Sequence, residues 1–210
     1  RIFGCLREND LFKNTWIIFT ADHGEMLGDH HMSQKNLFFE GSAHVPLLIM
    51  PPQGRSLPQN ISVEAPTDLV DLYPTILAMA GLSSPVSVSG RNLLEPVPMD
   101  RIFFGNSLNR NFCVMEEKVK LVYSAVGDHV LLFVLNTDPM EQHNLAEDPA
   151  WQERKAKLWK LLLEHTAQYT PEALDEKGQF LTYEAPHFPG DVPGRWFGFH
   201  YHDYSVDTFH

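Results

Sequence analysis

The chain has 210 residues, with 27 acidic against 16 basic side chains and a formal net charge of −11. This length suits one compact domain, or one domain with a small additional lobe. The acidic balance, without any basic block, disfavours sequence-independent binding to nucleic acid, so we expect no nucleic-acid partner. No apolar run approaches the ~18 residues that a transmembrane helix needs, so we expect no membrane span.

The beginning of the chain indicates that it continues a longer polypeptide. The first residue is Arg1, and nothing near it resembles a signal peptide. Residues 5–13 are typical of a helix end and a turn that Asn14 closes. Residues 15–20 are β-branched or aromatic and apolar on both faces, which predicts a buried strand of a parallel or mixed sheet. A polar cluster follows, at the end of the strand where α/β sheets place their ligands.

Further elements are expected as the chain continues to residue 100. Residues 37–42 suit a short helix, and residues 45–50 suit the next strand. A helix is predicted from Thr67 or Asp68 to Ala80, because the start residues can cap it and its apolar side chains share one face. Strands that alternate with helices in this way predict an α/β fold.

The pattern changes from Arg101 onward to short apolar runs, which predict a small antiparallel sheet. The runs are residues 102–104, 119–123 and 130–135. Gly127-Asp128 separates the last two runs and is typical of a hairpin turn. Asp148-Pro149 is a cap followed by proline at the first helical position, so a helix is predicted from there to about Gln168.

Asp22, His23 and Lys35 are the residues best suited to carry chemistry. A carboxylate and an imidazole that are adjacent on a loop can both turn toward one divalent cation. A cation together with a nearby lysine suits a tetrahedral oxyanion substrate, because the cation polarises one oxygen and the ammonium offsets the remaining charge. The alternative is a simple turn with a capping Asp22 and a solvated Lys35, and the dipeptide by itself leaves both interpretations open.

A longer ordered set of motifs resembles the sulfatase family of the alkaline phosphatase superfamily. The resemblance covers roughly residues 1–165. The His30-His31 pair is similar to the phosphonate monoester hydrolase branch. The matching segments are residues 20–31, Lys35, 39–40, 44–49, 67–76, 90–94, 118–122 and 136–145.

The resemblance implies a fold and a domain division. It implies the C-terminal part of an alkaline phosphatase-like mixed sheet flanked by helices, plus a small antiparallel sheet with a C-terminal helix. Residues 1–98 would be the C-terminal part of the catalytic domain, and residues 99–170 a small antiparallel α+β subdomain. The resemblance fades in residues 171–210, which by composition form a tail rich in aromatic residues and histidine. Its segment 196–204 we interpret as a packed strap or a subunit contact rather than a substrate or metal site.

The resemblance also implies roles for single residues. Asp22 and His23 match two metal ligands, usually of Ca²⁺ and sometimes of Mn²⁺ or Mg²⁺. Lys35 matches the catalytic lysine that contacts the sulfate or phosphoryl oxygens and the nucleophile. Gly24 matches a tight turn beside the metal, and His30 matches a recurrent histidine that either orients the loop or touches substrate. Glu40 and His44 also match family positions, and we interpret both as structural rather than substrate-binding.

The family's nucleophile is not found in this chain. It lies in a Cys/Ser-x-Pro-x-Arg motif whose Cys or Ser is oxidised to formylglycine. Neither Cys5 nor Cys113 is followed by that pattern, and the segment at 83–87 has the proline but lacks the arginine. We therefore expect the formylglycine and the upstream acidic metal ligands to come from an N-terminal half of the same protein, and this chain to be inactive by itself.

Three functions follow as expectations. The first is hydrolysis of sulfate esters, in a small molecule or a sulfated glycan, through a covalent formylglycine sulfate intermediate. The second is a phosphodiesterase or phosphonate monoester hydrolase with the same metal site. The third is a catalytically inactive fragment that acts as a structural or interaction module. The resemblance favours a periplasmic, secreted or lysosomal location.

Overall fold

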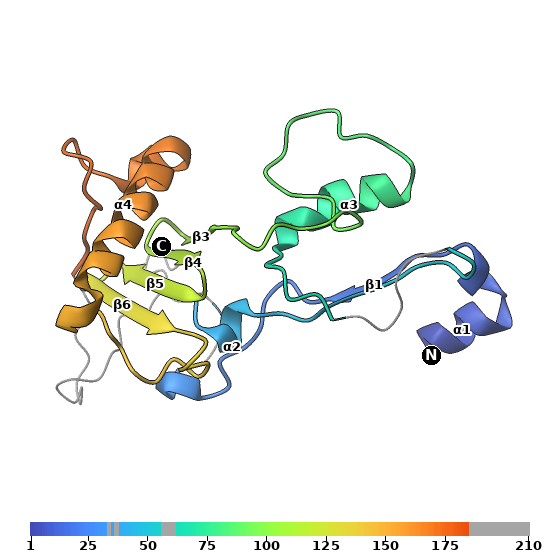
Figure 1. The fold of residues 1–210 in the computed structure, drawn as a ribbon, viewed down its shortest axis with the longest axis horizontal. Coiled ribbons are helices and arrows are strands. Elements are labelled where there is room, and N and C mark those ends of the chain that lie inside the picture. Colours follow the sequence, from blue (N-terminus) through green and yellow to red (C-terminus); the bar gives the residue numbers. More distant parts are fainter. Residues whose placement is uncertain (33–34, 36–37, 56–61, 185–210) are drawn as a thin grey trace, which may run out of the picture. The chain divides into compact units, whose positions relative to one another are not determined.

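The computed structural model describes residues 1–32, 35, 38–55 and 62–184 (Figure 1). The chain divides into two compact units. The first consists of Arg1–Asp22 and Val45–Asp100, and the second of His23–His44 and the chain from Arg101 onward. The second unit therefore takes up a segment that is inserted, in sequence, between the two parts of the first. The predicted divisions at 1–98, 99–170 and 171–210 stay predictions, and residues 185–210 of the tail lie outside the described residues.

The first unit begins with helix α1 (Ile2–Glu8) and a short 3-10 helix, Leu11–Lys13. Strands β1 (Ile17–Thr20) and β2 (Leu47–Met50) then pair antiparallel, with Ile17 opposite Met50. The prediction of a strand buried on both faces is wrong, because Phe19 is 60% exposed. Burial on both faces requires a layer on each side of a sheet, and a two-stranded ribbon by itself provides none.

Helix α3 (Leu72–Met79) confirms the predicted helix and its cap. It follows a 3-10 turn, Leu69–Asp71, and a capping box forms between Asp68 and Asp71. The Asp71 carboxylate is fully buried and accepts hydrogen bonds from the backbone N–H of Asp68 at 2.8 Å and of Arg91 at 2.7 Å. One buried acid therefore both starts the helix and holds the loop that follows it.

The second unit is built on an antiparallel sheet in the order β3-β4-β5-β6. The strands span Phe103–Ser107, Asn111–Glu116, Val119–Ser124 and His129–Val134. The expected antiparallel sheet and the hairpin at Gly127-Asp128 are confirmed. Strand β4 was not predicted. Its turn to β5 is Glu117-Lys118, both with positive φ, and this pair lacks the Gly, Asn or Asp that usually signals such a turn.

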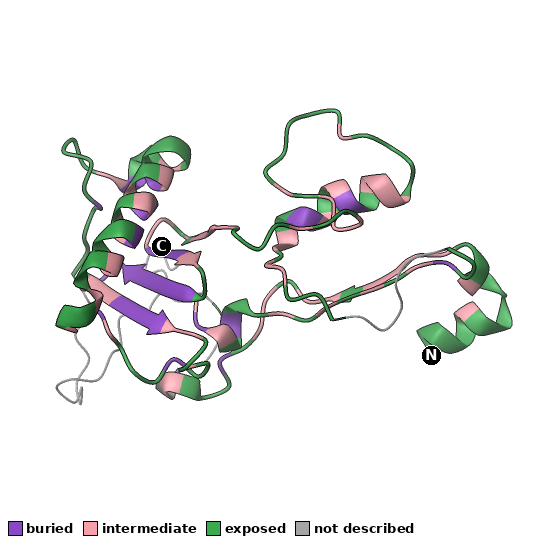
Figure 2. Ribbon diagram, viewed as in Figure 1, coloured by how far each residue is buried: buried purple, intermediate pink, exposed green. Residues whose placement is uncertain are grey.

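Two layers cover the two faces of this sheet. Helix α4 (Gln152–Tyr169) packs Leu158 and Leu162 with Phe112 and Leu121 on one face. The inserted segment, residues 23–44, covers the opposite face. Its apolar side chains pack there against alternate residues of the strands. This cluster consists of Met26, Met32, Phe39, Cys113, Val122, Leu131 and Phe133. Every residue of β5 is buried as a result, and Figure 2 shows this strand in purple.

The remaining elements of the second unit are short. The inserted segment holds a 3-10 turn, Asp29–His31, and helix α2 (Glu40–Ala43). Two further 3-10 turns, Pro149–Trp151 and Pro171–Ala173, flank α4, and the Asp148 side chain caps the first of them as predicted. Among the helices of the described residues, none is both long enough and apolar enough to cross a lipid bilayer.

Candidate active site

The loop that begins at His23 lies against helix α2. The backbone N–H of Gly24 donates to the Ser42 carbonyl at 2.7 Å, and that of Glu25 donates to the Gly41 carbonyl at 2.9 Å. A Cβ atom at Gly24 would stand 2.1 Å from the Gly41 carbonyl oxygen. Glycine is therefore required at residue 24 by the close approach of two backbones. The predicted role of Gly24 beside a metal stays a prediction.

The His23 ring is oriented by its own loop. Its Nδ1 lies 2.7 Å from the Gly24 carbonyl oxygen. Because a carbonyl oxygen only accepts hydrogen bonds, Nδ1 is the donor in this contact, which leaves Nε2 as the nitrogen that could bind a metal. A backbone carbonyl on one ring nitrogen is the usual way in which proteins orient a metal-ligating histidine. The ring is therefore suited to ligation through Nε2.

Lys35 is exposed, and its backbone is held by a buried side chain of α2. The Ser42 hydroxyl is the donor, and it lies 2.5 Å from the Lys35 carbonyl oxygen. Ser42 is only 2% exposed. The ammonium of Lys35 can thus sample solvent while its main chain is tied to the same helix that receives the His23 loop.

Of the predicted site residues, Lys35 and the neighbour of His23, Gly24, each form a hydrogen bond to Ser42 of helix α2. His23 and Lys35 belong to the second unit, whereas Asp22 is an exposed residue at the end of the first segment of the first unit. Within the described ranges, no three residues among His, Cys, Asp and Glu are grouped so that they could hold a metal ion. A carboxylate and an imidazole suit a divalent cation, but a hard cation such as Ca²⁺ takes about six to eight oxygen ligands. The described residues therefore form no complete ligand set of this kind.

His30 packs on an aromatic ring at the base of the inserted segment. Its imidazole stacks on Phe39, with ring centroids 4.2 Å apart, and Phe39 is buried. The backbone of His30 has a φ of 52°, in the left-handed region. Of the two roles that the sequence left open for His30, these contacts favour orientation of the loop over contact with substrate. The side chain of His31 lies outside the described residues.

A buried charged cluster, missed from the sequence, joins α2 to the sheet. The Lys120 ammonium lies 2.6 Å from a carboxylate oxygen of Glu40 and 2.6 Å from one of Glu141, and donates to the Phe38 carbonyl at 2.7 Å. Glu141 in turn accepts from the Glu40 backbone N–H at 2.6 Å. The signal in the sequence was a lysine inside the apolar run of β5, on the face opposite α4.

Burial and the opposite charges of this cluster shift the pKa values of its members in opposing directions. Burial lowers the pKa of Lys120, but the acidic groups around it outweigh burial and leave that pKa raised. Burial raises the pKa of Glu40, but Lys120 and His44 outweigh it and leave that pKa lowered. For the more deeply buried Glu141, burial dominates and the pKa is raised. The His44 Nδ1 lies 2.8 Å from a carboxylate oxygen of Glu40.

Cys113 belongs to the same buried face of the sheet. Burial raises the pKa of its thiol to about 12. A thiol with that pKa stays protonated at neutral pH and is a poor nucleophile. Cys5 is exposed, and both cysteines are free thiols.

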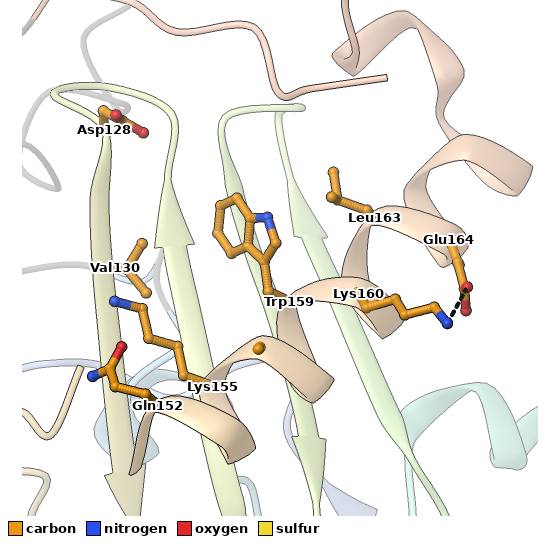
Figure 3. Close-up of a pocket in the computed structure, with 9 residues that line it drawn as sticks. Asp128, Val130, Gln152, Lys155, Trp159, Lys160, Leu163 and Glu164 are labelled. Carbon is orange, nitrogen blue, oxygen red and sulfur yellow. Dashed lines mark ion pairs between the residues drawn. The ribbon is translucent and has the colours of Figure 1, made fainter. Parts of the chain in front are cut away.

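A groove of about 540 Å³ lies along α4 beside strand β6 (Figure 3). Trp159 stands in it between Lys155 and Lys160, and Lys160 pairs with Glu164 at 3.8 Å. The groove contains none of the residues that the sequence predicts for catalysis or metal binding.

Comparison with known proteins places the chain in a family. The family model described as Sulfatase matches residues 1–82. Arylsulfatase K of Xenopus laevis is 33% identical over 165 residues, covering 69% of this chain and 30% of that protein. A protein of Escherichia coli named as uncharacterized sulfatase YidJ is 31% identical over 165 residues, covering 73% of this chain and 32% of that protein.

A solved structure extends this similarity to three dimensions. The phosphonate monoester hydrolase of Agrobacterium radiobacter superposes with a TM-score of 0.64 at 31% identity, covering 85% of this chain and 41% of that one. The expected α/β fold of this superfamily is confirmed. The chain spans about a third of the length of the curated relatives that it matches. On the evidence of the family model, the relatives and the fold together, the chain belongs to the sulfatase family.

Proposed function

We propose that this chain is the C-terminal part of a sulfuric ester hydrolase. The observation that carries the proposal is that the sulfatase family model covers residues 1–82, which include Asp22, His23 and Lys35. The substrate is a sulfate ester, in a small molecule or a sulfated glycan. The sulfate group is a tetrahedral oxyanion, which these three residue types can bind and polarise.

Each residue has a distinct part in this proposal. The Lys35 ammonium binds the sulfate oxygens and offsets charge that builds up as the ester bond breaks. Asp22 supplies a carboxylate oxygen and His23 its Nε2 to a divalent cation, most simply Ca²⁺. When bound, such a cation polarises a sulfate oxygen as a Lewis acid. The Gly24 contact and the Ser42 hydrogen bonds keep the His23 loop and the Lys35 backbone in place.

An upstream part of the same protein completes the site. It supplies the formylglycine nucleophile and the remaining metal ligands, so the chain by itself is inactive. Two observations support this. The relatives are about three times as long as the matched segment. The first unit also exposes large apolar side chains, among them Phe3, Phe19, Leu48 and Ile76, which a further layer would cover.

A phosphodiesterase or phosphonate monoester hydrolase is the second candidate. The similarity to the Agrobacterium radiobacter hydrolase, at 31% identity, favours it specifically. Phosphoryl and phosphonyl groups are also tetrahedral oxyanions, so the same lysine and cation serve either reaction. The substrate assay therefore decides between the two.

The test uses the complete protein, with its peptides mapped by mass spectrometry. A peptide carrying Cys/Ser-x-Pro-x-Arg with formylglycine, together with hydrolysis of 4-nitrophenyl sulfate, supports the sulfatase. Preferential hydrolysis of bis(4-nitrophenyl) phosphate or of 4-nitrophenyl phenylphosphonate supports the second candidate. Absence of all three activities, with calcium affinity no better than that of a generic acidic surface, supports an inactive structural module.

A further inference from the structure

Ser42 contacts both segments of the second unit that carry predicted site residues. Its carbonyl accepts from the Gly24 N–H at 2.7 Å, next to His23, and its hydroxyl donates to the Lys35 carbonyl at 2.5 Å. Ser42 is 2% exposed, so its own ends of both hydrogen bonds are buried. A buried hydroxyl that lost its acceptor would be left unsatisfied, which favours the observed geometry.

Helix α2, which carries Ser42, is itself anchored at a charged cluster. Glu40 opens the helix, pairs with Lys120 at 2.6 Å, and donates its backbone N–H to Glu141 at 2.6 Å. Lys120 and Glu141 are 3% exposed. Moving α2 away from the sheet would break both of these contacts of Glu40, so they favour the docked position of the helix. The position of Ser42 is thus set by the sheet of the second unit.

We propose that Ser42 is a positioning residue for the hydrolase site. It acts through Lys35, whose backbone its hydroxyl holds at a set distance from the loop of His23. The inference rests on the proposed function, because it assigns to Lys35 the binding of the transferred oxyanion. A lysine side chain is flexible, and a fixed backbone limits the volume that its ammonium samples. Small misplacements of a group that contacts the reacting atoms cost up to about 100-fold in rate.

The test is a double-mutant cycle on the complete protein, with 4-nitrophenyl sulfate and bis(4-nitrophenyl) phosphate as probes. Ser42→Ala is expected to lower kcat/KM about 10- to 100-fold in the wild-type background. In the Lys35→Ala background, the same change is expected to have almost no further effect, because Ser42 acts through Lys35. Ser42→Thr keeps the hydroxyl and is expected to restore most of the activity.

Ser124→Ala is the matched control. Ser124 is also buried, and its hydroxyl also donates to a backbone carbonyl, that of Val126 at 3.2 Å, within the sheet. Its removal is expected to leave kcat/KM within about twofold, because a surviving fold keeps the site in place. If Ser42→Ala does not fold, Ser42→Cys keeps the volume with a weak donor and takes its place in the cycle.

The outcomes separate the two proposals. A wild-type protein that hydrolyses neither probe counts against the proposed function. An active wild-type protein whose Ser42→Ala variant has unchanged kcat/KM overturns the inference alone. Equal losses from Ser42→Ala in the presence and absence of the Lys35 amine also overturn it, because they indicate a general structural effect.

Discussion

The Lys120 ammonium on strand β5 lies 2.6 Å from the Glu40 carboxylate on helix α2, although 80 residues separate the two in sequence. The pair ties the inserted segment, which carries His23 and Lys35, to the sheet. The ion pair that stabilises the fold therefore also holds in place the segment that carries two of the predicted site residues.

Lys120→Met should destabilise the protein by roughly 3–5 kcal/mol, because it leaves the Glu141 carboxylate buried without its partner. Equilibrium unfolding in urea, followed by far-UV circular dichroism, measures the change. Lys160→Met is the control, since Lys160 is 77% exposed and its partner Glu164 is 3.8 Å away. The control should change stability by less than about 0.5 kcal/mol. Equal stabilities of the two variants would contradict the assigned role of the cluster.

The contribution of Glu40 should depend on pH. Burial raises its pKa, but Lys120 and His44 outweigh burial, so the folded-state pKa lies below 4.5. A lowered acid pKa contributes stability above the unfolded value, and that stability is lost as the pH falls through the folded value. Glu40→Gln should therefore cost about 1–3 kcal/mol at pH 7 and progressively less below pH ~4.5.

Thermal or urea unfolding of the wild type and of Glu40→Gln, from pH 7 to pH 3, measures the difference in their free energies of unfolding. Glu147→Gln serves as its control, because Glu147 pairs with Lys155 at 3.1 Å but is 92% exposed. That control should show little difference from the wild type at any pH. A gap for Glu40→Gln that stays constant down to pH 3 would contradict the ionised state assigned to Glu40.

Gly24→Ala should disrupt the site, because its Cβ atom would stand 2.1 Å from the Gly41 carbonyl oxygen. The backbones of the His23 loop and of α2 would have to separate, and an activity loss of about 100-fold is expected. Gly41→Ala is a matched control, since the nearest atom to its Cβ would be the Met26 sulfur, at an ordinary contact distance of 3.5 Å. Steady-state kinetics on both variants decides the matter, and similar losses in the two would argue against the close backbone contact.

Lys35→Ala should lower kcat/KM by about 100- to 1,000-fold, the usual loss when one group that stabilises an oxyanion is removed. Lys35 is exposed, so the melting temperature should change little. Lys13→Ala removes another exposed lysine, which pairs with Asp10, and should leave the rate unchanged. A Lys35→Ala protein with full activity would exclude the catalytic role.

Removal of the cation should abolish activity reversibly. Dialysis of the complete protein against a chelator, followed by titration with Ca²⁺, Mn²⁺ or Mg²⁺, should restore the rate with one of the three ions. Asp22→Asn and His23→Ala should each raise the metal concentration needed for half of full activity, because each removes one ligand. Unchanged metal dependence in both variants would remove these residues from the metal site.

Local patterns predicted most of the elements but not all of them. Asp68 and Asp148 start helices as expected, because a cap is formed by residues that are neighbours in sequence. Strand β4 escaped prediction since its turn, Glu117-Lys118, lacks the usual residues for positive φ. The burial of β1 was predicted wrongly, because an apolar run indicates that a strand favours burial but not whether another layer packs on it.

The sequence by itself determined the family, the expected order of elements and the residues with suitable chemistry, Asp22, His23 and Lys35, because motifs and propensities are local in the chain. Only the tertiary structure decided that residues 23–44 cover one face of the sheet and that Lys120 is buried between two glutamates. It alone decided that Ser42 joins the His23 loop to Lys35. The physical reason is that such contacts link residues distant in sequence, and they arise when packing brings those residues together.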